Sequence, residues 1–119
     1  MYYKKQRGNS GEEIASAYLE NLGYKILVKN FQCRQGEIDI IALDNDEFVF
    51  VEVKTRTNKV YGEAVEAVNN IKKFHIWKTA KYYIYLKHLE DKPIRFDVIE
   101  VYLYNNEIKI NHIKQAIEM

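Results

Sequence analysis

The first part of the chain has apolar residues at helical spacing. We predict a helix over residues 11–22 because Ser10 is a suitable N-cap and because Glu12 and Glu13 suit the positive first turn. Gly23 is expected to end it. The positions that share its inward face are Ile14, Ala17, Tyr18 and Leu22.

Five further segments have the alternation and the β-branched or aromatic content of strands. A loosely alternating strand over residues 24–31 is followed by a polar turn at 32–36. Strands over 38–43 and 48–54 flank the turn residues 44–47, which predicts a hairpin. A second pair of strands, at 95–103 and 107–111, flanks the turn Asn105-Asn106.

Between the two strand pairs, residues 61–89 have the period of a long helix that is capped near Gly62. The positions expected to face the core are Val68, Ile71, Ile76, Ala80 and Tyr83. The predicted order of elements is therefore αβββαββ, an α/β fold with a mixed sheet, and a weak helix is expected at the end of the chain.

Composition narrows the class of protein. A chain of 119 residues with 47% apolar content predicts one domain, spanning 1–119. Lys and Arg number 18 against 17 for Asp and Glu, so any attraction to nucleic acid must be local. Cys33 is the only cysteine, which excludes an internal disulfide and multi-cysteine zinc sites. Because neither a membrane span nor a signal peptide is evident, we predict a cytoplasmic protein.

The first hairpin carries the candidate chemistry. If Asn45 and Asp46 are its two loop residues, Asp39 lies opposite Glu52, and the strand alternation turns both toward one face. Lys54 shares that face. The remaining residues expected on this face are Glu37, Ile41 and Phe50, and those expected on the other face are Ile38, Ile40, Ala42, Val49, Val51 and Val53.

Two carboxylates about 5 Å apart repel by roughly 3 kcal/mol at an effective dielectric of about 20, so a compensating cation is expected. Mg²⁺ binds one or two carboxylates together with water and phosphate oxygens, which suits Asp39 and Glu52. Lys54 could hold an attacking water and stabilise charge on a phosphoryl group. The alternative, which stays open, is a solvated face on which Glu37 pairs with Lys54.

With these residues identified, the segment GEIDIIALDNDEFVFVEVKTR (36–56) resembles the central signature of the YraN-like family of uncharacterised bacterial proteins. Members of that family are predicted endonucleases related to archaeal Holliday-junction resolvases. The resemblance continues in GEEIASAYLENLGYKILVKNF (11–31), YGEAVEAVNNIKKF (61–74) and RFDVIEV (95–101). It implies the restriction-endonuclease-like fold and its PD-(D/E)xK active site.

The resemblance assigns roles to individual residues. Asp39 matches the first acid of the motif, Glu52 the second and Lys54 the lysine, although Ile38 stands where the motif usually has proline. Glu12 matches the helical acid of the resolvase-like branch and would add a third ligand for Mg²⁺ or Mn²⁺. Glu13 is the alternative to Glu12. Glu37 would be an accessory acid or the ion-pair partner of Lys54.

A locally basic helix suggests where DNA could bind. No acid occurs between Ala67 and Leu89, whereas this stretch contains Lys72, Lys73, Lys78, Lys81 and Lys87. Such a face would contact phosphates without reading sequence, and Arg56 and Lys59 could continue its path. Lys72 and Lys73 are the helical lysines assigned to nucleic-acid binding, and Lys72 also matches the family pattern. The three histidines lack ligand spacing.

The aromatic residues of this helix, Tyr82, Tyr83, Tyr85 and Trp77, are expected to pack in the core or at an interface. An exposed apolar strip among them could support a homodimer. The sequence thus predicts a metal-dependent endonuclease for structured or branched DNA. The alternative from another class is a nucleic-acid-binding or adaptor protein that retains the fold without cutting.

Overall fold

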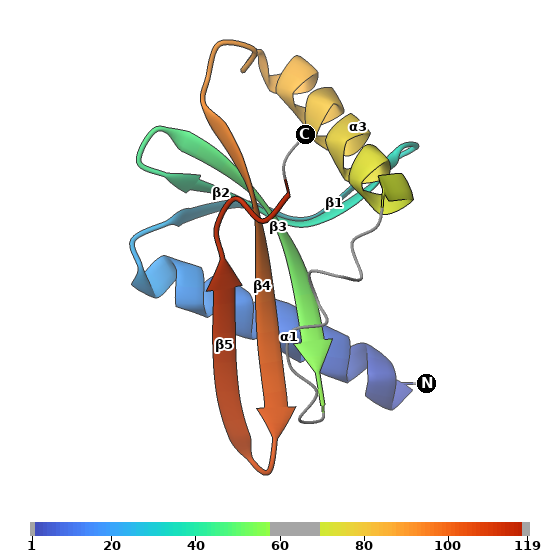
Figure 1. Ribbon diagram of the computed structural model, residues 1–119, viewed down its shortest axis with the longest axis vertical. Coiled ribbons are helices and arrows are strands. Elements are labelled where there is room, and N and C mark those ends of the chain that lie inside the picture. The colour runs from blue at the N-terminus through green and yellow to red at the C-terminus, as the bar shows by residue number, and fades with distance from the viewer. Residues whose placement is uncertain (1, 58–69, 118–119) are drawn as a thin grey trace.

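The computed structural model describes residues 2–57 and 70–117, and it describes side chains from Gly11 and from Ile71 onward in these two parts. A five-stranded sheet is packed against two helices in the described residues (Figure 1). The helices are α1 (Tyr2–Asn21) and α3 (Asn70–Lys87). The strands are β1 (Lys25–Cys33), β2 (Gly36–Asp44), β3 (Glu47–Arg56), β4 (Ile94–Tyr104) and β5 (Glu107–Ile113).

The sheet is mixed and its strands follow chain order, β1-β2-β3-β4-β5. Neighbouring strands are antiparallel except β3 and β4, which are parallel. A parallel pair needs a crossover connection, and α3 lies within the one between β3 and β4. The predicted order αβββαββ and the mixed α/β class are confirmed for the described residues, and the arrangement is consistent with the restriction-endonuclease-like fold.

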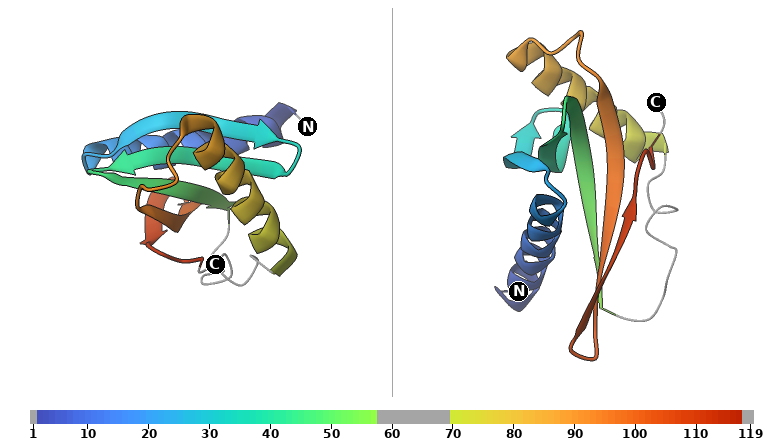
Figure 2. Two further views of the ribbon diagram at one scale, coloured as in Figure 1. Left: turned by 90° about the horizontal axis from the view of Figure 1, so that it is seen from above. Right: turned by 90° about the vertical axis from the view of Figure 1, so that its left-hand side faces the viewer.

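Two apolar clusters lie on opposite faces of the sheet, because alternate residues of a strand point to opposite sides. Figure 2 shows α1 against one side of β3 and β4. The cluster between α1 and the sheet contains Ala15, Leu19, Tyr24, Ile40, Ala42, Val49, Val51, Ile99 and Val101. The cluster beneath α3 contains Ile38, Ile41, Phe50, Ile76, Ala80, Tyr83, Phe96, Val98 and Ile117.

The position of Ile38 differs from the prediction. Ile38 and Ile40 belong to different clusters, although strict alternation would put them on one face. The pairing of β1 with β2 skips Asn30 and Asp39, and Asn30 has a left-handed backbone with φ 56°. This local irregularity changes the phase of alternation at Asp39, the residue expected to carry the chemistry.

Helix boundaries also differ. Helix α1 begins at Tyr2, so Ser10 lies inside it rather than at its N-cap. The preceding residues include lysine, glutamine and arginine without proline, which lets the helix extend. Gly23, with φ 94°, follows the end of α1 as predicted. Residues 114 and 115 form a turn, and the weak helix expected at the end of the chain is not present in residues 114–117.

In the second predicted helix, α3 accounts for residues 70–87, and the expected cap at Gly62 and the inward position Val68 lie outside the described residues. Ile76, Ala80 and Tyr83 are buried as predicted. Ile71 is not, because 72% of its surface is exposed. No helix in the described ranges is long and apolar enough to cross a membrane.

A buried ionic network ties β4 to the rest of the fold. The carboxylate of Asp97 is fully buried and accepts hydrogen bonds from Arg95 Nε at 2.9 Å and from the backbone N–H of Gln115 at 3.0 Å. His112 Nε2 lies 2.7 Å from the other oxygen of Asp97. Arg95 also donates to the Tyr24 hydroxyl at 2.7 Å. The network therefore joins β4 to β5 and to the segment that follows α1.

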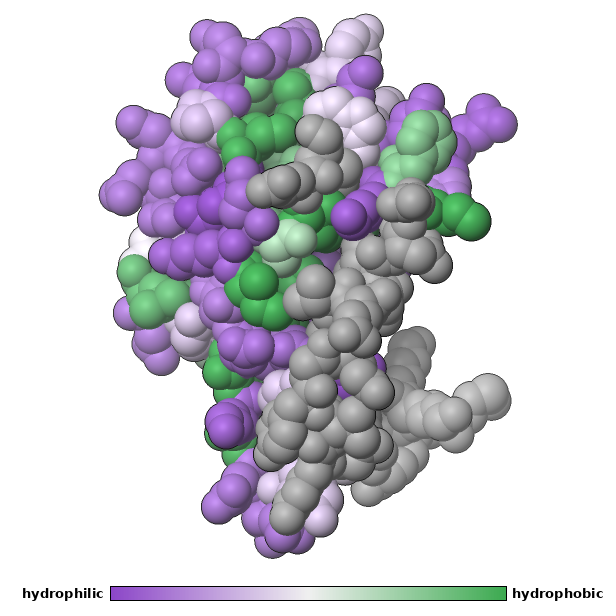
Figure 3. All heavy atoms as spheres, in the orientation of Figure 1, coloured by the Kyte–Doolittle hydropathy of each residue, from purple (hydrophilic) through white to green (hydrophobic). Residues whose placement is uncertain are grey.

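The surface is mixed in polarity. In the space-filling view, hydrophilic side chains cover much of the visible face, and hydrophobic patches lie between them (Figure 3). Several large apolar side chains of α3 are exposed, and they are considered below.

Candidate functional site

The two strands of the first hairpin separate at one end. Their ladder has the predicted register, from Asp44 opposite Glu47 to Ile40 opposite Val51. Beyond Ile40 and Val51 both strands continue, but they no longer pair with each other. Asp39 is therefore not a ladder partner of Glu52, which corrects the facing arrangement predicted from the hairpin.

The side chain of Asp39 takes the place of the missing backbone pairing. Its Oδ2 accepts a hydrogen bond from the backbone N–H of Val53 at 2.8 Å. This contact fixes the carboxyl group at the point where β2 and β3 part. The separation of the strands leaves room for polar side chains at the end of an otherwise apolar sheet.

A pocket of about 370 Å³ lies at this separation. It is formed by side chains from β2, β3 and α3, which are distant in sequence. The lining residues are Glu37, Asp39, Glu52, Val53, Lys54, Lys72, His75 and Ile76. The structure thus gathers the three residues of the predicted motif, together with Lys72, around one space.

Asp39 and Glu52 are close enough for their carboxyl groups to share a hydrogen bond. Burial raises the pKa of Asp39 to about 8, and the negative charge of Glu52 adds to this increase. The hydrogen bond from the Val53 N–H opposes it by favouring the charged form. Near neutral pH, Asp39 therefore keeps its proton unless a positive charge enters the pocket.

Two ammonium groups approach the Glu52 carboxylate. Lys72 Nζ lies 2.6 Å from Oε2, and Lys54 Nζ lies 3.6 Å from the same oxygen. Burial and the neighbouring Lys72 lower the pKa of Lys54. Burial also opposes the charge of Lys72, but hydrogen bonds to Glu52 and Lys54 raise its pKa above the ordinary value. Lys72 is the closer counter-ion of Glu52.

Glu12, on α1, lies near the acidic residues of the pocket. A Cβ at Gly11 would overlap the hydroxyl of Thr55, so only glycine allows α1 to approach β3 this closely. Burial raises the pKa of Glu12, a hydrogen bond from Asn30 opposes this, and the charges of Glu37 and Glu52 add to it. Glu12 is thus within electrostatic range of the acids without lining the pocket, whereas Glu13 is exposed.

Glu37 lies at the rim. Its carboxylate accepts a hydrogen bond from Gln32 Nε2 at 3.1 Å across the β1–β2 pair. Lys54 forms its ion pair with Glu52, not with Glu37. The arrangement with a Glu37–Lys54 pair on a solvated face is therefore not the one observed.

The remaining basic residues are more dispersed. The Nε and Nη2 atoms of Arg56 are buried and have no hydrogen-bond partner within the described residues. Lys59 lies outside those residues, and Lys73 is half-buried on α3 without lining the pocket.

His75 is a residue of the pocket that sequence reasoning set aside. Its Nδ1 lies 2.9 Å from the backbone oxygen of Gln35, which links α3 to the β1–β2 turn. It follows Lys72 by one helical turn, so its place beside the pocket could have been found from this spacing. The sequence placed His75 only among the basic residues of this helix, because no local pattern shows which of them meet the acids of the hairpin.

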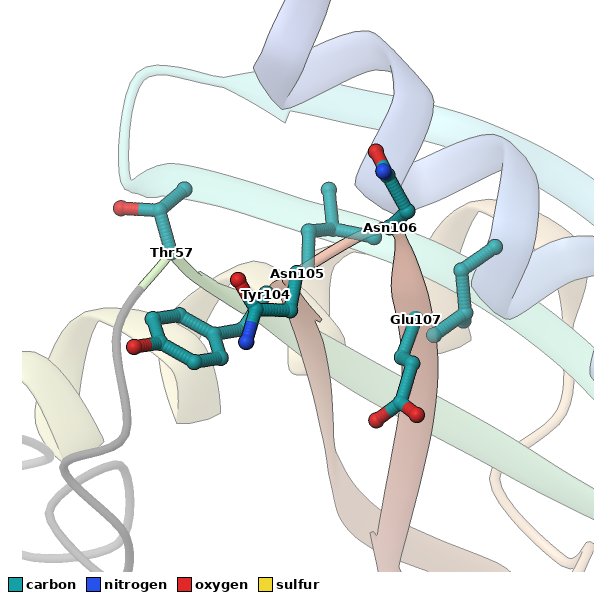
Figure 4. A pocket seen from close by; sticks show the side chains of 7 residues that line it. Thr57, Tyr104, Asn105, Asn106 and Glu107 are labelled. Carbon is teal, nitrogen blue, oxygen red and sulfur yellow. The ribbon is translucent and has the colours of Figure 1, made fainter.

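A separate hollow of about 600 Å³ lies at the β4–β5 turn, at the end of the molecule away from α3 (Figures 1 and 4). Its lining is Thr57, Leu103, Tyr104, Asn105, Asn106, Glu107 and Ile108. Among the described residues its lining has one carboxylate and no basic side chain, so it lacks the paired acids and cations of the pocket between β2, β3 and α3. We therefore take the latter as the candidate site.

The donor set of the candidate site suits a divalent cation. Asp39 and Glu52 offer oxygen ligands, and their mutual repulsion would be relieved by positive charge. Lys72 supplies such a charge to Glu52 in this structure. Among residues 2–57 and 70–117 there is no set of three or more Asp, Glu, His or Cys side chains grouped for metal binding. The fit consequently rests on two carboxylates.

Comparison with known proteins identifies close relatives. The model of the uncharacterised protein family UPF0102 matches residues 11–101. A UPF0102 protein of Clostridium tetani is 48% identical over 119 residues, covering 98% of each chain. One of Clostridioides difficile is 50% identical over 112 residues, covering 94% of this chain and 96% of its own. A third, from Caldanaerobacter subterraneus, is 49% identical over 95% of both chains.

Proposed function

The chain belongs to the uncharacterised protein family UPF0102, and we propose that it is a metal-dependent endonuclease that hydrolyses phosphodiester bonds in structured or branched DNA. The observation that carries the proposal is the pocket in which Asp39, Glu52 and Lys54 meet Lys72. Two acids and two ammonium groups lie where β2 and β3 stop pairing. This combination of charges suits a reaction in which a cation and a phosphate bind side by side.

Asp39 and Glu52 would hold Mg²⁺ or Mn²⁺, and Glu12 is near enough to act on it electrostatically. When bound, such a metal supplies Lewis acidity toward the phosphate and lowers the pKa of water. Asp39 must lose its proton to become a ligand. Binding should therefore release a proton and strengthen as the pH rises toward about 8, the pKa of Asp39.

The lysines would act on the substrate. Lys54 is half-buried beside Glu52, and its lowered pKa makes it suitable for holding a water and for passing protons. Lys72 is more exposed, and it comes from a different element. If Glu52 served as a metal ligand, the Lys72 ammonium could stabilise the negative charge that develops on the phosphoryl oxygens.

Nucleic-acid binding would come from α3 and from the end of β3. The described part of α3 has no acidic residue, and Lys72 and His75 of this helix line the pocket. Arg56 continues along β3 from Lys54, and its buried Nε and Nη2 would have to become accessible to contact a phosphate. Contacts from these residues to phosphates would depend steeply on salt and would not select a sequence.

The test is a pair of measurements on the same preparations. Calorimetric titration of Mg²⁺ and Mn²⁺ into the wild-type protein should detect binding that Asp39→Asn and Glu52→Gln abolish. Cleavage of branched DNA should require the metal and should fall by more than about a hundredfold in Lys54→Ala.

The outcomes separate the two classes of function. Metal binding and cutting that depend on the same residues support the endonuclease. DNA binding without metal binding or cutting would overturn it in favour of a non-catalytic nucleic-acid-binding protein. Asp91→Asn, which changes an exposed acid elsewhere, is the control and should leave both measurements unchanged.

A further inference from the structure

Helix α3 has an unusual outer face. Its exposed side chains include Ile71 at 72%, Phe74 at 55%, Tyr82 at 43% and Tyr85 at 67% of their surface. With Lys78 between Phe74 and Tyr82, consecutive positions are three or four residues apart, so they share one side of the helix. We call Ile71, Phe74, Lys78, Tyr82 and Tyr85 the outer row of α3.

The helix that carries this face is basic, although Glu90, which follows the helix, lines a hollow with Tyr85. The described part of α3 contains five lysines and no acid. Two of the lysines lie over aromatic rings: Lys78 Nζ is 5.3 Å from the centre of the Phe74 ring, and Lys81 Nζ is 5.7 Å from that of Trp77. Aromatic rings interleaved with cations are the composition of surfaces that bind single-stranded nucleic acid.

The outer row is continuous with the candidate site. The ring of Phe74 lies 6.1 Å from the ring of His75, which lines the pocket with Asp39 and Glu52. Farther along the helix, Tyr82 lines a hollow of about 360 Å³ with Gln32, Cys33, Arg34 and Gln35. This volume is within the range of small-molecule pockets, roughly 300–1,000 Å³, and Arg34 adds a positive charge at its edge.

We propose that the outer row of α3 binds unpaired bases of the nucleic acid, with Phe74 and Tyr82 as stacking platforms and Lys78 and Arg34 as contacts to the backbone. This rests on the proposed function to the extent that the ligand is a nucleic acid. It narrows the substrate to DNA with a single-stranded segment next to the scissile phosphate, such as a fork or an overhang. A purely double-stranded ligand would use the lysines but would leave the rings exposed to water.

Charge complementarity favours this ligand over a second copy of the chain. Lys78 is at the middle of the outer row, so two copies packed symmetrically through their outer rows would bring the two Lys78 ammonium groups together, with no acid on the described part of either helix. A polyanion neutralises the same lysines. Adjacency to a pocket suited to phosphodiester chemistry favours a nucleic acid over other polyanions.

Fluorescence anisotropy with labelled DNA, measured in EDTA so that no cutting occurs, tests the proposal. The probes are a blunt duplex and the same duplex with a single-stranded arm. The wild-type protein should bind the armed duplex more tightly. Phe74→Leu and Tyr82→Leu keep an apolar side chain but remove the ring. Each should weaken binding of the armed duplex by roughly fivefold to 150-fold, which is the loss of affinity expected when one base no longer stacks.

Three further variants separate stacking from general effects. Phe74→Trp keeps a ring and should retain the preference for the armed duplex. Lys78→Ala should weaken binding of both probes by similar factors, because it contacts the backbone. Tyr104→Leu removes an aromatic ring that is 39% exposed at the end of β4, and it should change neither affinity. The β4–β5 turn at that end of the strand lies at the opposite end of the molecule from α3 (Figure 1).

Equal affinity of the wild-type protein for both probes would overturn the proposal, as would an unchanged preference in Phe74→Leu and Tyr82→Leu. Self-association in sedimentation that Phe74→Leu abolishes, without loss of the preference for the armed duplex, would assign the row to a second copy instead. A binding preference that depends on Phe74 in a protein that cuts no DNA would sustain this inference while contradicting the proposed endonuclease.

Discussion

At the scale of single residues, the central feature is that Glu52 has two lysine neighbours while Asp39 has none at ion-pair distance among the described residues. The shorter contact, 2.6 Å, involves Lys72, which comes from α3 rather than from the strand that carries Glu52. A side chain from another element thus balances a charge that the hairpin itself creates. This arrangement makes Lys72 a competitor of any metal that uses Glu52.

We predict that Lys72→Ala has opposite effects on metal binding and on cutting. Removal of the ammonium group should tighten binding of Mg²⁺ or Mn²⁺ by roughly threefold to tenfold, since the metal no longer displaces an ion pair worth about 1 kcal/mol. Cleavage should fall, because a cation for the phosphate is lost. Calorimetry measures the first effect and a gel assay measures the second. Lys87→Ala, in the last turn of α3, should leave metal affinity unchanged.

Asp39 makes stability depend on pH. Because its pKa is raised to about 8 in the folded protein, the folded state binds its proton more tightly than the unfolded chain does. The stabilising contribution is complete below the unfolded pKa, near 4, and is lost as the pH rises through about 8. An asparagine at this position would remain uncharged throughout and could still accept the hydrogen bond from Val53.

Asp39→Asn should therefore be more stable than the wild-type protein in EDTA at about pH 9, by an amount on the order of a few kcal/mol once solvent screening is allowed for. The difference should shrink as the pH is lowered toward about 5. Urea unfolding at a series of pH values measures it. A difference that does not change with pH would contradict the assignment of the raised pKa to Asp39.

At the scale of elements, the site depends on how closely α1 approaches β3. Gly11 faces Thr55, and the absence of a Cβ permits the contact that brings the next residue, Glu12, near the acids. The irregularity at Asn30 and Asp39 acts together with this contact, because Asn30 forms a hydrogen bond with Glu12. The geometry around the pocket is therefore set jointly by α1, β1 and β2.

We predict that Gly11→Ala destabilises the fold by about 1–3 kcal/mol through overpacking against Thr55, although alanine favours helix formation. Chemical denaturation measures the loss. In a double-mutant cycle, Thr55→Ala should recover part of it, because it removes the hydroxyl that the new methyl group overlaps. If the losses in unfolding free energy of the two single variants simply added up in the double variant, the overlap with Thr55 would not be the reason that alanine is unfavourable at position 11.

At the scale of the whole molecule, the network around Asp97 joins β4 to β5 and to the segment after α1. Burial by itself would raise the pKa of Asp97. Hydrogen bonds from His112, Arg95 and the Gln115 backbone outweigh this effect, so the pKa of Asp97 is lower than that of a free carboxyl group. The stability that results is present above the ordinary pKa of the carboxyl group. It is lost as the pH falls through the lower pKa of the folded state.

Asp97→Asn should cost about 1–3 kcal/mol at about pH 7, because an amide cannot accept all the hydrogen bonds that the buried carboxylate receives from Arg95, His112 and Gln115. Arg95 keeps its ion pairs with Asp44 and Glu47, so its charge is not left without a partner. The gap between variant and wild type should narrow in acid, as the wild-type carboxylate itself becomes protonated. Urea unfolding at neutral and acidic pH measures both values. Asp91→Asn, an exposed acid in the connection before β4, should remain within about 0.5 kcal/mol of wild type.

The sequence by itself determined the order of elements and the register of the first hairpin. Strands and helices repeat their apolar residues at different intervals, and this difference is visible in short stretches of sequence. The turn at Asn45 and Asp46 determines which residues of β2 and β3 face each other, as the pairing of Ile40 with Val51 confirms. The motif residues Asp39, Glu52 and Lys54 were likewise identifiable from charged positions within apolar strands.

Only the tertiary structure decided how those residues meet. The parting of β2 and β3 beyond Ile40, the phase change at Asp39 and the contact of Lys72 with Glu52 all depend on packing between segments far apart in the chain. The exposure of Ile71 and Phe74 has the same origin, since helical period alone cannot tell which face of α3 meets the sheet when both faces carry apolar residues. Local pattern specifies elements, whereas the site is formed by long-range contacts that no local pattern encodes.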